Sequence, residues 1–241
     1  MVKFQNVSFS YDGEHPVLED LSFTINKGEA VGLIGANGAG KSTIMNLLLG
    51  LLKGSGEILV DGLPVNKQNL PQIRQKIGFV LQNSDNQMFM PTVYEDMIFG
   101  PLNYGLSREE AEQRVDKVLD MLGLQALKHR HNHKISGGEK RMAAIATILA
   151  MEPEMIVMDE PSTALDPVNR RRVINTINSL PQTKLIASHD LDMILDTCQR
   201  VLLISRGKIV ADGDAEAVLL DKALLEANQM ELPLCIQGWQ R

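Results

Sequence analysis

Aromatic side chains are scarce in this sequence, where Phe, Trp and Tyr together make up 4% of 241 residues. Hydrophobic residues nevertheless reach 44%, so aliphatic side chains and Met must fill most of the core of a chain this long. An excess of positive charge is also missing, because the formal net charge is −6. We therefore expect no nucleic-acid partner, since such binding needs clustered positive charge.

Cysteines and long apolar runs are equally rare. Cys198 and Cys235 lie far apart and match no metal or redox spacing, which indicates reduced thiols in a cytosolic protein. The first residues contain no apolar stretch of the signal-peptide kind. The densest apolar run, residues 47–52, stops at Lys53 and is too short to span a bilayer. Any role at a membrane is therefore expected to depend on a partner protein.

The spacing of apolar residues predicts the fold class. Residues 1–35 alternate apolar and polar side chains, which predicts half-buried strands of an antiparallel sheet. Ala30–Ile34 predicts a buried strand, followed by a glycine-rich turn and a helix over residues 41–52. Further buried strands are expected at residues 77–80, 155–158 and 185–187. Strands separated by helices indicate an α/β fold with a mainly parallel sheet.

A helical segment interrupts this pattern. Residues 107–110 form a capping box, and the apolar residues that follow lie at helix spacing: Ala111, Val115, Val118, Leu119 and Leu122. We expect one domain over residues 1–241. Its α/β core and β subdomain cover residues 1–82 and 136–222, and its α-helical subdomain covers residues 83–135. The tail, residues 223–241, has weak periodicity and is expected to be partly mobile.

Residues 35–42 fit the phosphate-loop pattern G-x-x-x-x-G-K-[ST]. Its glycines let the backbone aim N–H groups at phosphate oxygens, and the following helix adds its positive end. Lys41 is suited to reach the β- and γ-phosphates of ATP, and the Ser42 hydroxyl to ligate Mg²⁺. An ordinary glycine-rich turn is the alternative, which the flanking strand and helix disfavour. The predicted ATP-binding residues here are Gly35, Asn37, Gly38, Ala39, Gly40, Lys41, Ser42 and Thr43.

An acidic pair follows the apolar strand at residues 155–158. Alone, such a pair is more often structural than functional. Combined with a phosphate loop, however, it predicts that Asp159 holds Mg²⁺ through water and that Glu160 orients or deprotonates the attacking water.

Residues 135–139, Ile-Ser-Gly-Gly-Glu, resemble the ABC (ATP-binding cassette) signature Leu-Ser-Gly-Gly-Gln. The resemblance implies the P-loop NTPase fold of ABC ATPases and ATP hydrolysis. It also implies that Ser136, Gly137 and Gly138 close on ATP held by another subunit. The expected partner is therefore a second ABC ATPase subunit, either the same chain or a paralogue. Ile135 and Glu139 are mild departures from the signature.

Other positions resemble further functional residues of this family. Tyr11 is similar to the aromatic residue that stacks on adenine, although a tyrosine at a strand end is usually packing. Gln82 is similar to the glutamine that touches Mg²⁺ and water and senses the membrane partner. Residues 162–166, which end at Asp166, resemble the loop through which the two subunits communicate. His189 is similar to the switch histidine near the γ-phosphate, although a lone His after a strand is generally structural.

Residues 82–89, 92–96 and 99–103 resemble the cobalt-type, energy-coupling-factor ATPases. That branch implies uptake of cobalt, nickel or a vitamin such as biotin. It implies an integral membrane coupling protein and a substrate-capture protein as partners, with this chain peripheral at the cytoplasmic face of the membrane. Met88, Phe89, Met90 and Met97 would suit a pliable groove for a partner's helix, with core packing as the alternative.

Three other interpretations are open, of which a DNA-repair or chromosome ATPase is disfavoured because no sustained heptads lie between Lys41 and Ser136. A soluble ABC ATPase, for example one serving iron–sulphur cluster assembly, also carries Ser-Gly-Gly-Glu, but residues 83–103 speak against it. A binding module without catalysis would be expected to lack Glu160 or His189, and both are present. The histidines at 129, 131 and 133 are interleaved with Lys128, Arg130 and Lys134, which repel a cation, so a solvated loop is expected rather than a metal site.

Overall fold

The structure, a computed structural model, describes residues 1–237, and the chain divides into two compact units. Unit 1 comprises Met1–Arg74 and Pro181–Arg241, and unit 2 comprises Gln75–Leu180. The finer division into a core, a helical subdomain and a tail stays a prediction.

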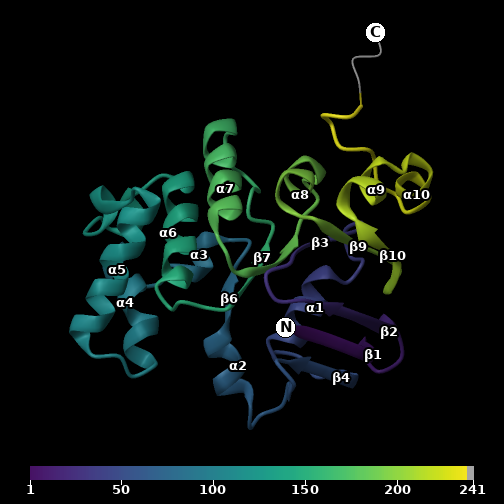
Figure 1. Ribbon diagram of the computed structural model, residues 1–241, viewed down its shortest axis with the longest axis horizontal. Helices are drawn as coiled ribbons and strands as arrows, with labels where there is room; N and C mark the ends of the chain where they lie inside the picture. The colour runs from purple at the N-terminus through teal and green to yellow at the C-terminus, as the bar shows by residue number, and fades with distance from the viewer. Residues whose placement is uncertain (238–241) are drawn as a thin grey trace. The chain divides into compact units, whose positions relative to one another are not determined.

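Unit 1 contains an antiparallel sheet built from the alternating segments. Its strands are β1 (Val2–Ser10), β2 (Pro16–Ile25), β4 (Ser55–Val60) and β5 (Leu63–Pro64), in the order β2-β1-β4-β5. Figure 1 shows β1 and β2 side by side. The inward-facing apolar residues are buried, and the rings of Phe4 and Phe23 stack across the β1–β2 pair at 4.4 Å. The predicted antiparallel strands are therefore confirmed.

The second group of strands in unit 1 carries the phosphate loop. It consists of β3 (Ala30–Ile34), β8 (Thr183–Ala187), β9 (Arg200–Ser205) and β10 (Lys208–Asp214). β3 pairs in parallel with β8 and with β9, whereas β10 pairs antiparallel with β9. Every residue of β3 and β8 is buried, as the apolar runs predicted.

Two helical predictions for unit 1 need correction. The helix predicted over residues 41–52 is shorter, because α1 (Lys41–Leu48) ends where Gly50 adopts a φ of 63°. The tail has more structure than its weak periodicity predicted. Asp221 caps the helix α10 (Lys222–Ala227), and backbone N–H groups of Leu234 and Cys235 donate to the Asp192 carboxylate at 3.2 and 2.9 Å. Residues 238–241 of the predicted mobile tail lie outside the described residues.

The remaining helices of unit 1 are short. They are α8 (Leu191–Thr197), α9 (Ala215–Leu220) and, continuing in sequence into unit 2, α2 (Leu70–Lys76).

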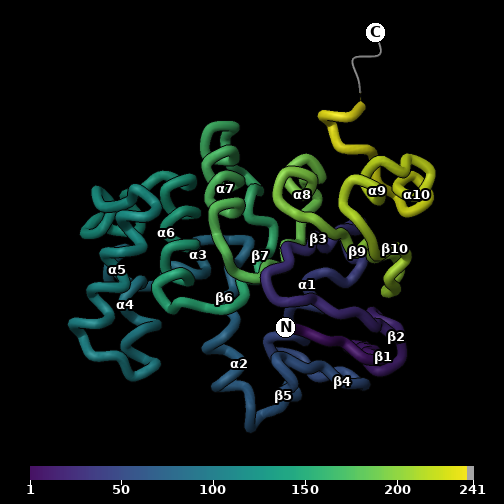
Figure 2. Tube along the Cα trace, viewed as in Figure 1, coloured from purple at the N-terminus to yellow at the C-terminus, as the bar shows by residue number. Residues whose placement is uncertain are grey.

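Unit 2 joins two parallel strands to most of the longer helices. Its strands are β6 (Ile77–Val80) and β7 (Met155–Asp159). Its helices are α3 (Ser84–Gln87), α4 (Val93–Asn103), α5 (Arg108–Leu122), α6 (Gly137–Leu149) and α7 (Pro167–Ser179), with short 3-10 turns at Gln125–Leu127 and Asn132–Lys134. Helices α4, α5 and α6 pack against one another, as Figure 2 shows. The capping box predicted at residues 107–110 is present and the stripe after it is buried.

Within the part of the chain that the structure describes, every helix is too short or too polar to cross a bilayer.

Candidate functional site

One edge of the unit 1 sheet brings together two predicted site elements. β3 and β8 are parallel, with Leu33 opposite Ala187, so the phosphate loop and His189 leave neighbouring strands at the same edge. The N–H of Ser188 donates to the Leu33 carbonyl oxygen at 3.4 Å, which keeps the two chain segments together beyond the strands. Ligands bind at this carboxyl edge in parallel α/β sheets.

The phosphate loop has a backbone that only glycine can adopt at its first position. Gly35 has a φ of 151°, and a Cβ there would lie 2.2 Å from the carbonyl oxygen of Ile204 in β9. The loop ends at Gly40, the N-cap of α1, which brings no side chain to the first-turn N–H groups. The positive end of α1 is therefore presented to a ligand rather than to a capping side chain.

The Lys41 side chain is hydrogen-bonded to the phosphate loop. Its ammonium is buried and donates to the carbonyl oxygens of Gly35 and Ala36 at 2.6 and 3.2 Å. Ser42 lies on the same turn of α1 and is exposed. These groups supply a positive charge and a hard oxygen donor, as a phosphate with its magnesium requires.

Tyr11 lies beside the first turn of α1. Its hydroxyl is 3.3 Å from Thr43 Oγ1, its ring meets the Phe9 ring edge-on at 4.8 Å, and 65% of the residue is exposed. A ring that is fixed at both ends yet exposed on one face is suited to stacking on a base. The proximity to the phosphate loop is an observation, whereas adenine binding stays a prediction.

The turn after Tyr11 is fastened by a residue that the sequence interpretation missed. Asp12 accepts hydrogen bonds from the backbone N–H groups of Glu14 and His15 and from the Ser10 hydroxyl at 2.8–2.9 Å. These bonds, led by the His15 N–H, hold the pKa of the Asp12 carboxyl well below its usual range. An Asp in a polar segment followed by Gly13 is a typical turn signal that could have found it.

Unit 2 repeats the sheet-edge arrangement with different residues. β6 and β7 are parallel, with Val80 opposite Met158, so Gln82 and Glu160 each follow the same edge by two residues. Glu160 is 7% exposed, and its φ of 48° is uncommon for a residue with a side chain. Thr163 Oγ1 donates to its carboxylate at 3.5 Å. Residues in this conformation occur in turns as well as at functional sites, so the geometry is compatible with the predicted role of Glu160.

Arg141 anchors the segment that carries Gln82, and it too was missed. Its buried guanidinium donates to the carbonyl oxygens of Leu81, at 2.7 Å, and of Gln82. The Gln87 side-chain oxygen accepts from the Leu81 N–H, and its side-chain nitrogen donates to the Ala144 carbonyl oxygen. Helix α6 and the Gln82 segment are thus tied together within unit 2. A single charge on the buried face of a helix, four residues before Ile145, was the available signal.

The predicted signature forms the start of α6. Ser136 is its N-cap and Glu139 closes a capping box: the Glu139 N–H donates to Ser136 Oγ, and the Ser136 N–H and hydroxyl donate to the Glu139 carboxylate at 2.7 and 2.8 Å. These bonds lower the pKa of Glu139. The predicted helix start is present, with its capping bonds made within the chain.

Asp166 is the N-cap of α7. Its carboxylate accepts from the N–H groups of Val168 and Asn169 at 3.0 Å and from the Asn169 side-chain amide. The bonds from Asn169 and Val168 lower the pKa of Asp166, so it is ionised at neutral pH. The residue predicted to take part in subunit communication therefore has a fixed orientation.

The structure bears on the predicted partner groove and on the histidine run. Met88 and Met97 are buried in unit 2, so core packing is correct for them and the predicted groove is wrong at these positions. Phe89 is exposed and Met90 is half-buried. In the histidine run, the rings of His131 and His133 lie 5.4 Å apart. Across the described residues, no three His, Cys, Asp or Glu side chains form a group able to hold a metal ion.

Comparison with known proteins fits this arrangement. Residues 18–163 match the ABC transporter family. The chain is 41% identical over 239 residues to the energy-coupling factor transporter ATP-binding protein EcfA of Methanothermobacter thermautotrophicus, covering 97% of this chain and 77% of that protein.

Two solved structures share the fold. One is CbiO1 of Clostridium perfringens, part of the ABC transporter complex CbiONQ, with 33% identity, a TM-score of 0.84, and coverage of 94% of this chain and 93% of that one. The other is a dimeric bacterial ABC transporter cassette, with 28% identity, a TM-score of 0.80, and coverage of 89% and 99%.

The chain therefore belongs to the ABC transporter family. It is an ATP-binding cassette with the family's ATPase fold, which confirms the fold class, the enzyme class and ATP as its nucleotide.

Proposed function

We propose that this ABC ATPase drives an importer of the energy-coupling-factor type. It would act at the cytoplasmic face of the membrane and energise uptake of a transition-metal ion such as cobalt or nickel, or of a vitamin. Its partners would be a second cassette, identical or paralogous, an integral membrane coupling protein and a substrate-capture protein. The similarity to EcfA and to a subunit of CbiONQ supports this branch.

In this proposal, unit 1 supplies nucleotide binding. Tyr11 stacks on the base, and the N–H groups of the phosphate loop and the Lys41 ammonium bind the phosphates. His189, which leaves the sheet edge beside that loop, orients the γ-phosphate. Magnesium, when bound with ATP, neutralises phosphate charge, and the oxygen donors of Ser42, Gln82 and Asp159 fit its preference for hard ligands.

Unit 2 supplies the groups for hydrolysis and for pairing. Glu160 takes the proton of the attacking water, or orients that water, as the oxygen–phosphorus bond forms and ADP leaves. The start of α6, with Ser136, Gly137 and Gly138, engages ATP held by the second cassette, and the Asp166 segment contacts that cassette. The solved dimeric relative supports such pairing.

Coupling to the membrane partner needs a contact surface on this chain, and the observation that supports one is an exposed aromatic pair in unit 2. Phe89 is 63% exposed, and its ring meets that of Phe99 on α4 edge-on at 5.1 Å. Leu102, one turn further along α4, is also exposed. These three residues form an apolar contact surface of the kind that receives an apolar partner helix. The Phe89 end of this surface follows α3, directly beyond the Gln82 segment.

A buried carboxylate holds this surface in shape. Asp96 accepts from the N–H groups of Phe89 and Met90 at 3.1 Å, and the Asn132 amide donates both to Asp96 and to the Met90 carbonyl oxygen. Burial raises the pKa of Asp96, while these same bonds oppose that rise. The backbone that carries Phe89 is therefore tied to α4, which favours binding because less ordering is needed.

The test is to replace Phe89 by Asp and compare it with Met121→Asp. Met121, on α5 of the same unit, is 56% exposed and lies outside the apolar contact surface. Each tagged variant is produced in its native host, membranes are solubilised in mild detergent, and the co-purifying proteins are identified. We expect a small integral membrane protein with the wild type and with Met121→Asp, and about a tenth as much or less with Phe89→Asp.

Other outcomes would redirect the proposal. Co-purification of two full-sized permease subunits would indicate a conventional ABC transporter. Soluble partners alone, found reproducibly with membranes intact, would contradict transport and favour an ABC ATPase of another kind. Equal recovery of the membrane protein with Phe89→Asp would contradict the coupling role of the apolar contact surface.

A further inference from the structure

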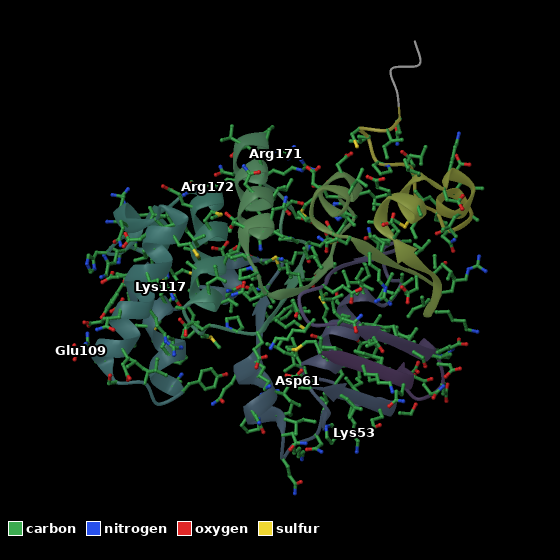
Figure 3. The ribbon with its side chains drawn as sticks, viewed as in Figure 1. Lys53, Asp61, Glu109, Lys117, Arg171 and Arg172 are labelled. Atoms are coloured by element: carbon green, nitrogen blue, oxygen red, sulfur yellow. The ribbon has the colours of Figure 1, made fainter. Side chains whose placement is uncertain are left out.

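The two glycines of the signature differ in their surroundings. A Cβ built on Gly137 would meet nothing within 4 Å, whereas a Cβ on Gly138 would lie 2.2 Å from Cγ of Asn169 and 2.4 and 2.5 Å from its side-chain nitrogen and oxygen. No real side-chain carbon sits that close to another atom. The second glycine is therefore in close contact with the first turn of α7, the helix on which Figure 3 labels Arg171 and Arg172.

Asn169 is not free to move away from Gly138. Its backbone N–H donates to one oxygen of the Asp166 carboxylate at 3.0 Å, and its side-chain amide donates to the other. A rotation of the side chain would break the second bond, which is strengthened by the charge on Asp166. The amide group of Asn169 thus lies against Gly138 of the signature and is bonded to the N-cap of α7.

We propose that Asn169 is a positioning residue that fixes the start of α6 relative to Asp166, so that the two move as one body. The inference rests on the proposed function, in which these two segments of one cassette meet the second cassette and its ATP. Because close-packed contacts transmit displacement, a shift of Asp166 would carry Gly138 with it. Asn169 itself touches neither nucleotide nor magnesium in this account.

A different reason for glycine at position 138 makes the opposite prediction. If its bare backbone serves only the approach of a phosphate, then a methyl group at 138 is harmful whatever stands at 169. If it serves contact with Asn169, then shortening Asn169 makes room for that methyl group. The double variant therefore separates the two explanations.

The experiment compares Gly138→Ala, Asn169→Ala and the double variant with the wild-type chain. For each, the kcat and KM of ATP hydrolysis and the midpoint of thermal unfolding are measured. We expect Gly138→Ala to lower kcat about tenfold or more. The added methyl group overpacks the contact with Asn169 and so displaces the start of α6 from its position relative to Asp166. Asn169→Ala removes one hydrogen bond and should lower kcat about two- to tenfold, with little change in ATP affinity. The double variant should return to the level of Asn169→Ala.

Ser136→Ala with and without Asn169→Ala is the matched control, and here no rescue is expected because Ser136 is bonded to Glu139. A double variant as impaired as Gly138→Ala, in both kcat and unfolding midpoint, would overturn the proposal. If Gly138→Ala fails to fold, recovery of folded protein on adding Asn169→Ala supports the contact equally. Absence of ATPase activity in the wild type would contradict the proposed function instead, while the unfolding midpoints still test the contact.

Discussion

Helices α1 and α6 both begin at a segment predicted to bind phosphate, yet their first turns are built differently. α1 begins after Gly40, which offers no capping side chain, and the loop before it places Lys41 against its own carbonyl oxygens. α6 begins after Ser136, whose hydroxyl and N–H are bonded to Glu139 in a complete capping box. The first helix start presents its N–H groups to a ligand, whereas the second already has an internal carboxylate partner.

This difference indicates a division of work between the two helix starts. A single chain is equipped to bind ATP at α1, because the N–H groups and the Lys41 ammonium attract phosphate there. At α6 a phosphate must compete with the Glu139 carboxylate for the Ser136 hydroxyl. In the proposed function, we therefore expect binding at α6 to require a phosphate that is already held in place on the second cassette.

The largest expected effect comes from a variant that leaves both helix starts intact. Glu160→Gln should lower turnover about a hundredfold or more, because it removes the proposed general base, and such a base contributes at least that factor. ATP binding by the single chain should be unchanged. Steady-state ATPase rates and equilibrium nucleotide binding check both statements. Glu109→Gln, an exposed replacement on α5, is the control. Near-normal turnover in Glu160→Gln would remove Glu160 from the mechanism.

A smaller effect is expected from weakening the internal cap of α6. Glu139→Gln removes a negative charge near the incoming phosphate, and such a charge at about 4 Å in water is worth about 1 kcal/mol. The KM for ATP should then fall about two- to fivefold, while ATP affinity of the single chain stays constant.

Glu110→Gln supplies the matched control for that change, because Ser107 and Glu110 form the same capping box at the start of α5. A rise in KM for Glu139→Gln alone would show that the cap assists phosphate binding rather than competing with it.

The sequence predicted those parts of the molecule whose signals are local. The phosphate loop, the buried strands, the antiparallel strands and the capping box at Ser107 depend on residues a few positions apart, and all are present. The sheet edges could also be predicted, since parallel strands end together. The roles of the individual site residues remain predictions.

Contacts between residues distant in sequence could not be predicted from local sequence signals. The hydrogen bonds from Arg141 to Leu81 and Gln82 join residues about 60 positions apart in the sequence. The Gly138–Asn169 contact joins two helices. Neither has a periodic pattern, because each is set by how the helices pack. The helix α10 was missed for another reason: its Asp221 cap is a weak signal without the expected apolar stripe.

Equilibrium ATP binding to single chains, with Lys41→Ala and Ser136→Ala side by side, tests the division of work most directly. The measurement is made at protein concentrations low enough to keep the chain monomeric. Lys41→Ala should lose affinity about tenfold to a hundredfold, because charge-assisted bonds to phosphate are lost. Ser136→Ala should bind ATP as tightly as the wild type. An equal loss of affinity in both variants would contradict the account, since α6 would then bind the same chain's nucleotide.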